Sequence, residues 1–388
     1  MSDTSPPAPA TDAVLEPEPS EPVGAVQVRP ARSRRTTAVK VVLAAVAAVV
    51  VFLAPAYIDA EYLTVANWVM VGAVGGMGLT MLVGQAGQLS LAHSFFALVG
   101  GVSYAVLAGP RDEASYTGLG LPSLLAAVLA VLCAGLVGAA FAPISGRLRG
   151  IYLGVASLSL VFVGFWLARE LPSLAGSTSS GRYAPSLNLF GFDFGELHPE
   201  LHVLNVPMGK VERSFWLYAA LTALAYVLGR GALSGRVGRG WRALRDNEAV
   251  ATVMGVSVVR QKALAFAVSS AYAGLAGVMV VWWYDGLMKP DESVDFGTYS
   301  TTAAISYLAI CVIGGLGSLG GAVLGSVVVF GLPQIIQLVT SSDDYSGTGF
   351  TPGVITNFVF GSLIVLIILF EPRGLAGLGA RLRAVLRR

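Results

Sequence analysis

Long blocks of apolar residues constrain this chain more than any other feature of its sequence. Ten such blocks, most of them close to twenty residues long, are separated by short polar stretches, and a bilayer core requires about twenty apolar residues per helix. Only 12 % of the 388 residues are charged, about half the share typical of soluble domains. Because a helix satisfies its own backbone groups in lipid, the sequence predicts an all-α polytopic membrane protein with about ten transmembrane helices. The predicted spans are 39–58, 62–83, 90–108, 121–143, 150–170, 214–229, 263–284, 298–318, 322–340 and 353–370.

Three of these spans depart from the ideal pattern. The block 214–229 is short, and glycines interrupt the blocks 90–108 and 298–318. Each interrupted segment either crosses the membrane or re-enters it from one side, because irregular backbone is tolerated in a membrane only where protein or water surrounds it. The sequence leaves both arrangements open.

The first 38 residues differ in composition from the rest. Seven of the 19 prolines lie within the first 30 positions, where a group of acidic residues precedes four arginines. Such a segment buries too little apolar surface to offset its ordering entropy, so we expect 1–38 to be a disordered, Pro- and Arg-rich extension. It does not fit a secretory signal, since no small-residue cleavage site follows a short apolar core.

The distribution of Arg and Lys predicts the orientation of the helices. Basic residues gather around 146–150, in the loop 230–262 and in the tail 371–388, whereas the intervening loops are acidic or neutral. The positive-inside rule places these basic segments in the cytoplasm, which ten helices allow and nine do not. We therefore expect a multi-pass plasma-membrane protein of the bacterial type, with a transmembrane domain over 39–370, both termini cytoplasmic and 171–213 as an extracytoplasmic loop.

Two histidines of the 171–213 loop, His198 and His202, are four residues apart. That spacing suits a metal shared on a helix, but Pro199 lies between them and no fourth ligand is evident. We therefore expect a solvated loop with room for a short helix, and no metal site.

Residues that several functions require are missing. No helix centre carries an Asp, Glu, Lys or Arg, which argues against a proton-driven pump, although a sodium site built from carbonyls and hydroxyls stays open. None of the four lysines lies in a GxxxxGK[ST] loop, and the GxGxxG match at 315–320 lacks the strand and acidic residue of a dinucleotide site. We expect no enzyme activity, no ATP site and no cofactor on this chain. A stand-alone secondary transporter or channel remains an alternative.

Two polar, Gly-rich breaks interrupt the apolar blocks, one in each half of the chain. The first is 84–94, GQAGQLSLAHS, and the second is 314–321, GGLGSLGG. Paired interruptions of this kind indicate a substrate path, whereas a tight turn between neighbouring helices is the alternative for both. The candidate path residues are Gln85, Gln88, Ser90, His93, Gly314, Gly315 and Gly317.

The charged loop 230–262 is too long for a turn. It carries seven basic residues against two acidic ones, and the spacing of Trp241, Leu244, Ala251 and Met254 predicts one helix with a common apolar face. A basic face lying on anionic lipid is one interpretation, and a helix that docks on a partner is the other. The mixture of Arg245, Asp246, Asn247 and Glu248 favours a partner, since lipid binding does not need the acids.

Four segments together resemble the permease subunits of branched-chain amino acid ABC importers. They are LRGIY (148–152), GQAGQLSLAHSFF (84–96), GRGWRALRDNEAVATVMGVSVVRQKALAFAVSSAYAGLAGV (238–278) and GGLGSLGGAVLG (314–325), and the resemblance covers roughly residues 60–335. The related urea and short-chain amide permeases share much of this pattern, so they remain an alternative.

The resemblance implies partners and a role for the charged loop. A second homologous permease would pair with this chain, two cytoplasmic ATPases would bind the ATP, and an extracytoplasmic binding protein would deliver the solute. A helix of the loop would sit in a groove of an ATPase, and 238–262 is the matching segment, with Glu248 and Gly255 at the signature positions. The general importer signature has a second Ala where Val250 stands, and its Gly follows the Glu by six positions rather than seven.

Overall fold

The computed structural model describes residues 34–111, 118–148, 150–176, 181–195, 201–203, 206–284, 287–288 and 299–340, with short pieces between 358 and 377. The chain divides into two compact units, 1–50 and 51–388. Most of helix α1 (Arg34–Leu53) belongs to the first unit, and Val42, Val46 and Val49 on it are exposed. Because α1 begins at Arg34, the last five residues of the expected disordered extension are helical, and the rest of that extension lies outside the described residues.

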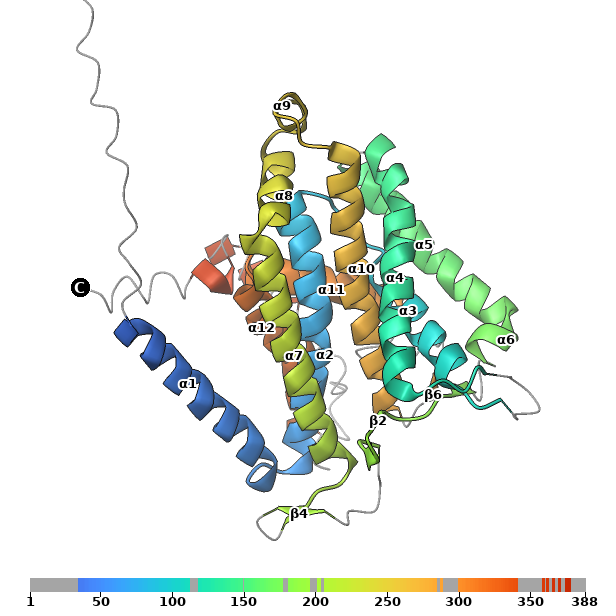
Figure 1. Cartoon of the computed structure of the whole chain (residues 1–388), viewed down its shortest axis with the longest axis vertical. Helices are drawn as coiled ribbons and strands as arrows, with labels where there is room; N and C mark the ends of the chain where they lie inside the picture. Colours follow the sequence, from blue (N-terminus) through green and yellow to red (C-terminus); the bar gives the residue numbers. More distant parts are fainter. Residues whose placement is uncertain are drawn as a thin grey trace, which may run out of the picture. The chain divides into compact units, whose positions relative to one another are not determined.

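The second unit is built mainly from helices (Figure 1). Its longer helices are α2 (Ala60–Thr80), α3 (His93–Ala108), α4 (Ser123–Arg147), α5 (Ile151–Glu170), α7 (Lys210–Ser234), α8 (Arg236–Asp246), α10 (Val258–Trp283), α11 (Thr301–Gly314), α12 (Leu319–Ser326) and α13 (Leu332–Thr340). Two single turns of π-helix, η2 (Met81–Gln85) and η3 (Val327–Gly331), extend α2 and join α12 to α13. The short helices are η1 (Ala54–Ala56), α6 (Pro172–Ala175) and α9 (Glu248–Val253).

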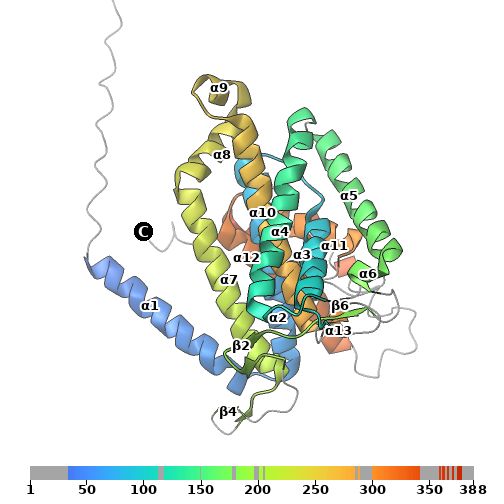
Figure 2. The same ribbon diagram turned by 45° about the vertical axis from the view of Figure 1, so that its right-hand side comes forward.

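Helix α10 lies at the centre of the unit. It packs against α2, α3 and α4, and α2 packs in turn against α7, α11 and α12; Figure 2 shows α10 alongside α4. Glycines allow the close approach of α3 and α10: a Cβ added to Gly277 would lie 2.0 Å from the carbonyl oxygen of Ala97. In lipid, helices lack a hydrophobic driving force for association, so close van der Waals packing stabilises their contacts. Small residues at such crossings permit that packing.

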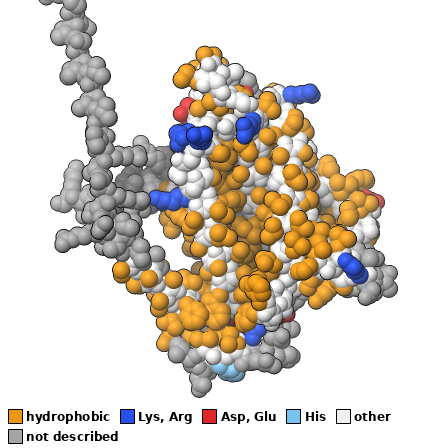
Figure 3. Space-filling model, in the orientation of Figure 1, with side chains coloured by type: hydrophobic (Ala, Val, Ile, Leu, Met, Phe, Trp, Pro, Cys, Tyr) orange, Lys and Arg blue, Asp and Glu red, His pale blue; other side chains and the backbone are white. Residues whose placement is uncertain are grey.

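Six described helical segments are long and apolar enough to cross a membrane, which is fewer than the ten spans expected from the sequence. They are Ala60–Gln85, Ser123–Arg147, Ile151–Glu170, Lys210–Ser234, Val258–Trp283 and Leu319–Val339. Helix α3, helix α11 and the apolar segment Ala45–Ala56 are shorter, while the block 353–370 lies mostly outside the described residues. The chain is therefore a mostly helical, multi-pass membrane protein, and the count of ten is not confirmed. Figure 3 shows hydrophobic side chains over most of one face of the helices.

The 171–213 segment contains more local structure than its sequence indicated. The expected short helix is α6, and five two-residue strands follow: β1 (Arg182–Tyr183), β2 (Asn188–Leu189), β3 (Phe192–Asp193), β4 (His202–Val203) and β5 (Val206–Pro207). β2 pairs with β3, β4 with β5, and β1 with β6 (Leu287–Met288), all antiparallel.

Two buried arginines hold this segment in place. Arg182 donates from Nε to the carbonyl of Ala105 at the end of α3, 3.3 Å away, and Arg213 donates from Nη1 to the carbonyl of Asp193 at 2.8 Å. The expectation of a solvated loop is therefore wrong for these two positions. Sequence reasoning missed them because nothing in the sequence distinguishes an arginine that is buried against backbone carbonyls from one that is exposed to solvent. His202 is exposed, His198 lies outside the described residues, and the described residues contain no cluster of metal-binding side chains.

The single helix expected from Trp241 to Met254 is divided in two. Asn247 adopts an extended backbone between α8 and α9, and its Oδ1 accepts hydrogen bonds from the backbone N–H groups of Ala249 and Val250. Asparagine is a preferred N-cap, and it starts a new helix here instead of continuing the old one. Of the four residues expected to share one face, Trp241, Leu244 and Ala251 are buried, whereas Met254 is 78 % exposed.

Candidate functional site at the helix breaks

The first break begins in the last turn of α2. In the π-turn η2 the amide of Ala86 bonds the carbonyl of Met81, and the amide of Gln88 bonds the carbonyl of Leu82 at 3.1 Å. A regular helix would instead pair the amide of Gln88 with the carbonyl of Gly84. The π-turn therefore frees the Gly84 carbonyl for a partner outside the helix. Residues 87–92 are not helical, and α3 begins at His93.

The second break is the turn 315–318 between α11 and α12. Gly315 and Gly317 have φ of 104° and 85°, values that favour glycine because a Cβ would clash with the backbone. Ser318 then starts α12, since its side chain accepts a hydrogen bond of 3.0 Å from the amide of Gly321. The sequence motif thus supplies both the turn and the start of the next helix.

The two breaks touch each other, although 232 residues separate their contact residues along the chain. Nε2 of Gln85 donates a 2.7 Å hydrogen bond to the carbonyl of Gly317. A Cβ on Gly84 would lie 2.1 Å from the amide nitrogen of Gly317, so the two backbones are in direct contact. Of the predicted path residues, the structure therefore brings Gln85 and Gly317 together.

The charged loop reaches this contact through Arg245. Its Nη1 donates to the carbonyl of Gly84 at 2.8 Å, and the same guanidinium pairs with Asp246 at 3.2 Å. Gly87, with φ of 68°, packs on the Arg245 side chain, because a Cβ there would lie 2.9 Å from Cγ of Arg245. The freed carbonyl of the first break is thus satisfied by a cation, which also suits the negative end of a helix dipole.

The other predicted path residues lie inside the packing. Ser90 is buried and its hydroxyl accepts from the amide of Ala92 at 3.3 Å, while Nε2 of half-buried Gln88 donates to the carbonyl of Ala86 at 3.4 Å. His93 is 1 % exposed, and its ring meets that of Tyr307 edge-on at 4.8 Å. Gly314 packs directly on Gly321 of α12. In this arrangement Ser90 and His93 are closed off from solvent.

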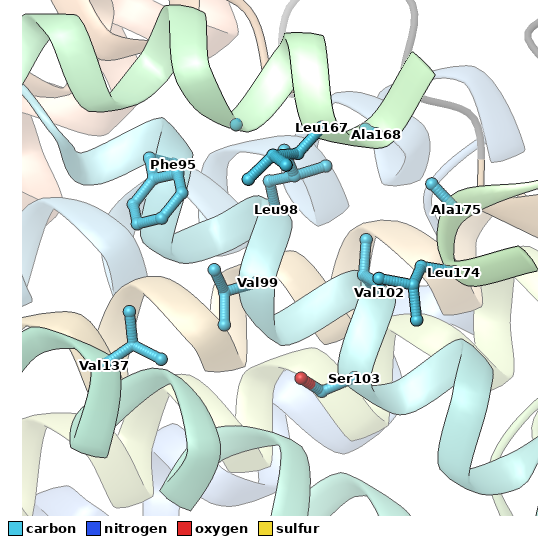
Figure 4. Close-up of a pocket in the computed structure, with 11 residues that line it drawn as sticks. Phe95, Leu98, Val99, Val102, Ser103, Val137, Leu167, Ala168, Leu174 and Ala175 are labelled. Atoms are coloured by element: carbon cyan, nitrogen blue, oxygen red, sulfur yellow. The ribbon is translucent and has the colours of Figure 1, made fainter. Parts of the chain in front are cut away.

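An apolar cavity of about 240 Å³ lies between α3, α4, α5 and α6 (Figure 4). Its wall is made mostly of aliphatic side chains, together with Phe95, Gly164 and Ser103. The aliphatic residues include Leu98, Val99, Val102, Val137 and Leu167. The Ser103 hydroxyl is the polar side-chain group among the lining residues. A zwitterion placed there would lose hydration without gaining charged partners, so this cavity does not suit the head of an amino acid.

The predicted coupling residues have partners within the chain. Oε1 of Glu248 forms an ion pair of 3.0 Å with Nζ of Lys262, whose side chain is only 2 % exposed. Asn247 caps α9, and Gly255, with φ of 79°, ends it. The Glu248–Lys262 pair fixes α9 to the first turns of α10, a role that the sequence motif did not reveal.

Between Glu248 and Gly255 the loop carries an exposed apolar tip, defined here as Val250, Val253 and Met254. Their exposed fractions are 56 %, 87 % and 78 %. Basic residues of α8 precede the tip, and Figure 3 shows Lys and Arg side chains near that end of the molecule. The predicted single helix placed Met254 on the same face as Trp241, so sequence reasoning missed the tip. The signal that could have found it is Asn247, a preferred N-cap residue that starts a new helix just before these apolar residues.

Comparison with known proteins identifies the family. A family model described as the permease component of the branched-chain amino acid transport system matches residues 61–368. The chain belongs to this permease family. Over 325 residues the permease is 29 % identical to the high-affinity branched-chain amino acid transport system permease protein LivM of Salmonella typhimurium, covering 80 % of this chain and 69 % of that one.

Two further relatives show how widely the similarity extends. The permease is 25 % identical over 309 residues to the high-affinity branched-chain amino acid transport system permease protein LivH of Escherichia coli, covering 79 % and 91 % of the two chains. It is 24 % identical over 311 residues to the probable branched-chain amino acid transport permease protein LivM of Methanocaldococcus jannaschii, covering 77 % and 84 %. No solved structure gives a significant match.

Proposed function

We propose that this permease is a transmembrane subunit of an ATP-binding cassette importer that moves branched-chain or similar amino acids into the cell. It pairs with a second homologous permease, two cytoplasmic ATPases drive it, and an extracytoplasmic binding protein delivers the solute. Family membership supports the transport role, and the LivM and LivH relatives are the basis for the solute class. The proposal includes about ten spans, with both termini and the 230–262 loop in the cytoplasm.

The observation that carries the ATPase partnership is the exposed apolar tip. Val253 and Met254 are more than three-quarters exposed. The rest of the loop is fixed by two contacts. Nε1 of Trp241 donates to the carbonyl of Gln261 at 3.2 Å, and Glu248 pairs with Lys262. A fixed support that presents apolar side chains to water is typical of a docking surface, where a few such anchors provide most of the binding energy. ATP binding moves this loop, and the helices that flank 84–94 and 314–321 then reorient.

The same proposal assigns the substrate path to the breaks. Gln85, Gln88, Ser90 and His93 line the path, and the stretch 314–321 is its flexible joint. Because Ser90 and His93 are buried here, they meet solute only after the helices that flank the breaks reorient. Amide and hydroxyl groups then hold the polar head of the amino acid, while apolar helix faces accept its aliphatic side chain.

The test is affinity purification of the tagged permease from its own host in mild detergent, followed by mass spectrometry. We expect a second multi-span protein and one or two ATPases to co-purify. Glu248→Arg is a poor probe of docking, because it would place a second cation beside buried Lys262. Met254→Arg is better, since this side chain is 78 % exposed and has room for an arginine.

We expect Met254→Arg to lose the ATPases and the uptake of labelled leucine, while the conservative Met254→Leu keeps both. Equal membrane levels of the two variants show that insertion is intact. Retention of the ATPases by Met254→Arg would refute the docking role of the tip. A wild-type chain that purifies alone and carries leucine in liposomes without ATP would refute the importer and favour a secondary transporter.

A further inference from the structure

Arg245 joins the loop to the first break. Arg245 is the last but one residue of α8, and its side chain, 43 % exposed, extends to the carbonyl that η2 leaves free. Loss of this 2.8 Å hydrogen bond would leave a buried carbonyl without a partner, which is energetically unfavourable. Gly87 packs on the stem of the same side chain, so the contact includes the aliphatic part as well as the guanidinium.

Arg245 projects from a rigid support. Trp241, one turn earlier, is fully buried and bonds the carbonyl of Gln261, and Gly240 lies so close to the Gln261 side chain that a Cβ would meet it at 2.8 Å. On the other side of Arg245, the backbone N–H of Asn247 donates to the carbonyl of Ala243 in α8 while its side chain caps α9. Glu248 then fixes α9 to Lys262. The tip, α9 and the end of α8 are thus linked closely enough to be displaced together.

The first break passes any displacement on to the second. The backbone of Gly84 lies directly against that of Gly317, and Gln85 bonds the Gly317 carbonyl. Since cores are close-packed, one of these segments cannot shift toward the other without moving it. A chain of direct contacts therefore runs from Arg245 through Gly84 and Gln85 to Gly317.

We propose that Arg245 is the positioning residue that transmits movement of the 230–262 loop to both helix breaks at once. This inference rests on the proposed function, in that the ATPases supply the movement. When the loop shifts, the guanidinium displaces the Gly84 carbonyl, and Gly317 follows through its contacts with Gly84 and Gln85. The alternative is that Arg245 only caps the end of α2, in which case the breaks move without it.

The test uses the exposed side chain of the second break as a reporter. Leu316 is 60 % exposed and lies next to Gly317. In a chain with Leu316→Cys, Cys133→Ser and Cys311→Ser, the rate of maleimide labelling is measured in the co-purified complex, with and without ATP and orthovanadate. We expect ATP to change the labelling rate at least threefold when Arg245 is present.

Arg245→Ala should reduce that change to less than 1.5-fold, and Arg245→Lys should restore most of it, because an ammonium can still donate to the Gly84 carbonyl. The matched control is Arg242→Ala: Arg242 lies on the same helix but donates to the carbonyl of Leu233, so its removal should leave the full change. A cap without a transmitting role would not separate these variants by nucleotide response.

Undiminished nucleotide response in Arg245→Ala would overturn the proposal, and so would a parent complex whose Leu316→Cys reporter ignores ATP. If Arg245→Ala does not assemble, Gln85→Ala removes the other link and should weaken the response at Leu316→Cys while Arg245 stays in place. An unweakened response there would also overturn the chain of contacts. Failure of the wild-type permease to co-purify with ATPases would instead refute the proposed function, which is a separate result.

Discussion

The two helix breaks meet at one contact, but the first contributes side-chain groups to it and the second contributes mainly backbone. The first carries polar side chains, and its contacts are made by the amide of Gln85 and by the carbonyl that binds Arg245. The second contributes mainly backbone: its Gly317 presents a carbonyl and a surface without side chain, and two of its glycines have positive φ. The first break therefore provides the side chain that donates the hydrogen bond. The second provides the acceptor carbonyl and, because Gly317 has no side chain, the space for a close approach.

This difference separates two kinds of requirement. At the second break substitution is limited by conformation and space, because the turn needs positive φ and the approach of Gly84 leaves no volume for a Cβ. At the first break, the limit is largely chemical, because a donor must reach the Gly317 carbonyl. Gly84 and Gly87 are the exceptions within the first break. Space limits Gly84, whereas a φ of 68° and the packing of Arg245 limit Gly87. Substitutions at both breaks can test whether the division holds.

The largest effect is expected for Gly84→Ala. The added Cβ would lie 2.1 Å from a backbone nitrogen, which cannot rotate away, so the two breaks must separate. We expect a loss of about 3 kcal/mol of unfolding free energy, at the upper end of the cost of overpacking, measured as a lower midpoint of thermal unfolding in detergent. Gly320→Ala is the control, because its Cβ would have no neighbour within 4 Å. Equal midpoints for the two variants would contradict the direct backbone contact.

Gly315→Ala should have the next largest effect. Its φ of 104° excludes the conformations that alanine prefers, and its backbone also packs against Gly374. We expect a cost of about 2 kcal/mol, from the strain of a side chain at positive φ. The measurement is again thermal unfolding, and a variant as stable as Gly320→Ala would show that the turn can adopt another conformation.

Particular residues show what the sequence could predict. Glycine spacing and apolar periodicity, which are local properties, predict both breaks, the helices beside them and a shared apolar face for Trp241 and Leu244. The meeting of Gln85 with Gly317 does not, since the two are far apart in the chain and nothing in either motif names its partner. Glu248 shows the same limit: its motif suggests an external role, whereas the pairing with Lys262 appears only once α9 lies beside α10.

Gln85→Ala tests the chemical requirement of the first break. The substitution removes the donor to the Gly317 carbonyl without adding volume, so only the hydrogen bond and some packing are lost. We expect about 1 kcal/mol less stability, the usual net worth of a hydrogen bond. Gln88→Ala is the matched control, because the side-chain Nε2 of Gln88 donates to the nearby Ala86 carbonyl of the same break, at 3.4 Å. If both variants lose the same stability, the link between the breaks is not a special contribution of Gln85.

Ser318→Ala should give the smallest effect, because it removes a side-chain contact from the break that depends least on side chains. The hydroxyl accepts from the amide of Gly321 and caps the short helix α12, so its loss should cost about 1 kcal/mol or less. Ser318→Asp keeps an acceptor at the N-cap and should keep most of the stability. The comparison is made by thermal unfolding of Ser318→Ala, Ser318→Asp and Gln85→Ala side by side. A loss in Ser318→Ala larger than that in Gln85→Ala would reverse the contrast between the breaks, because the second would then depend on a side chain more than the first.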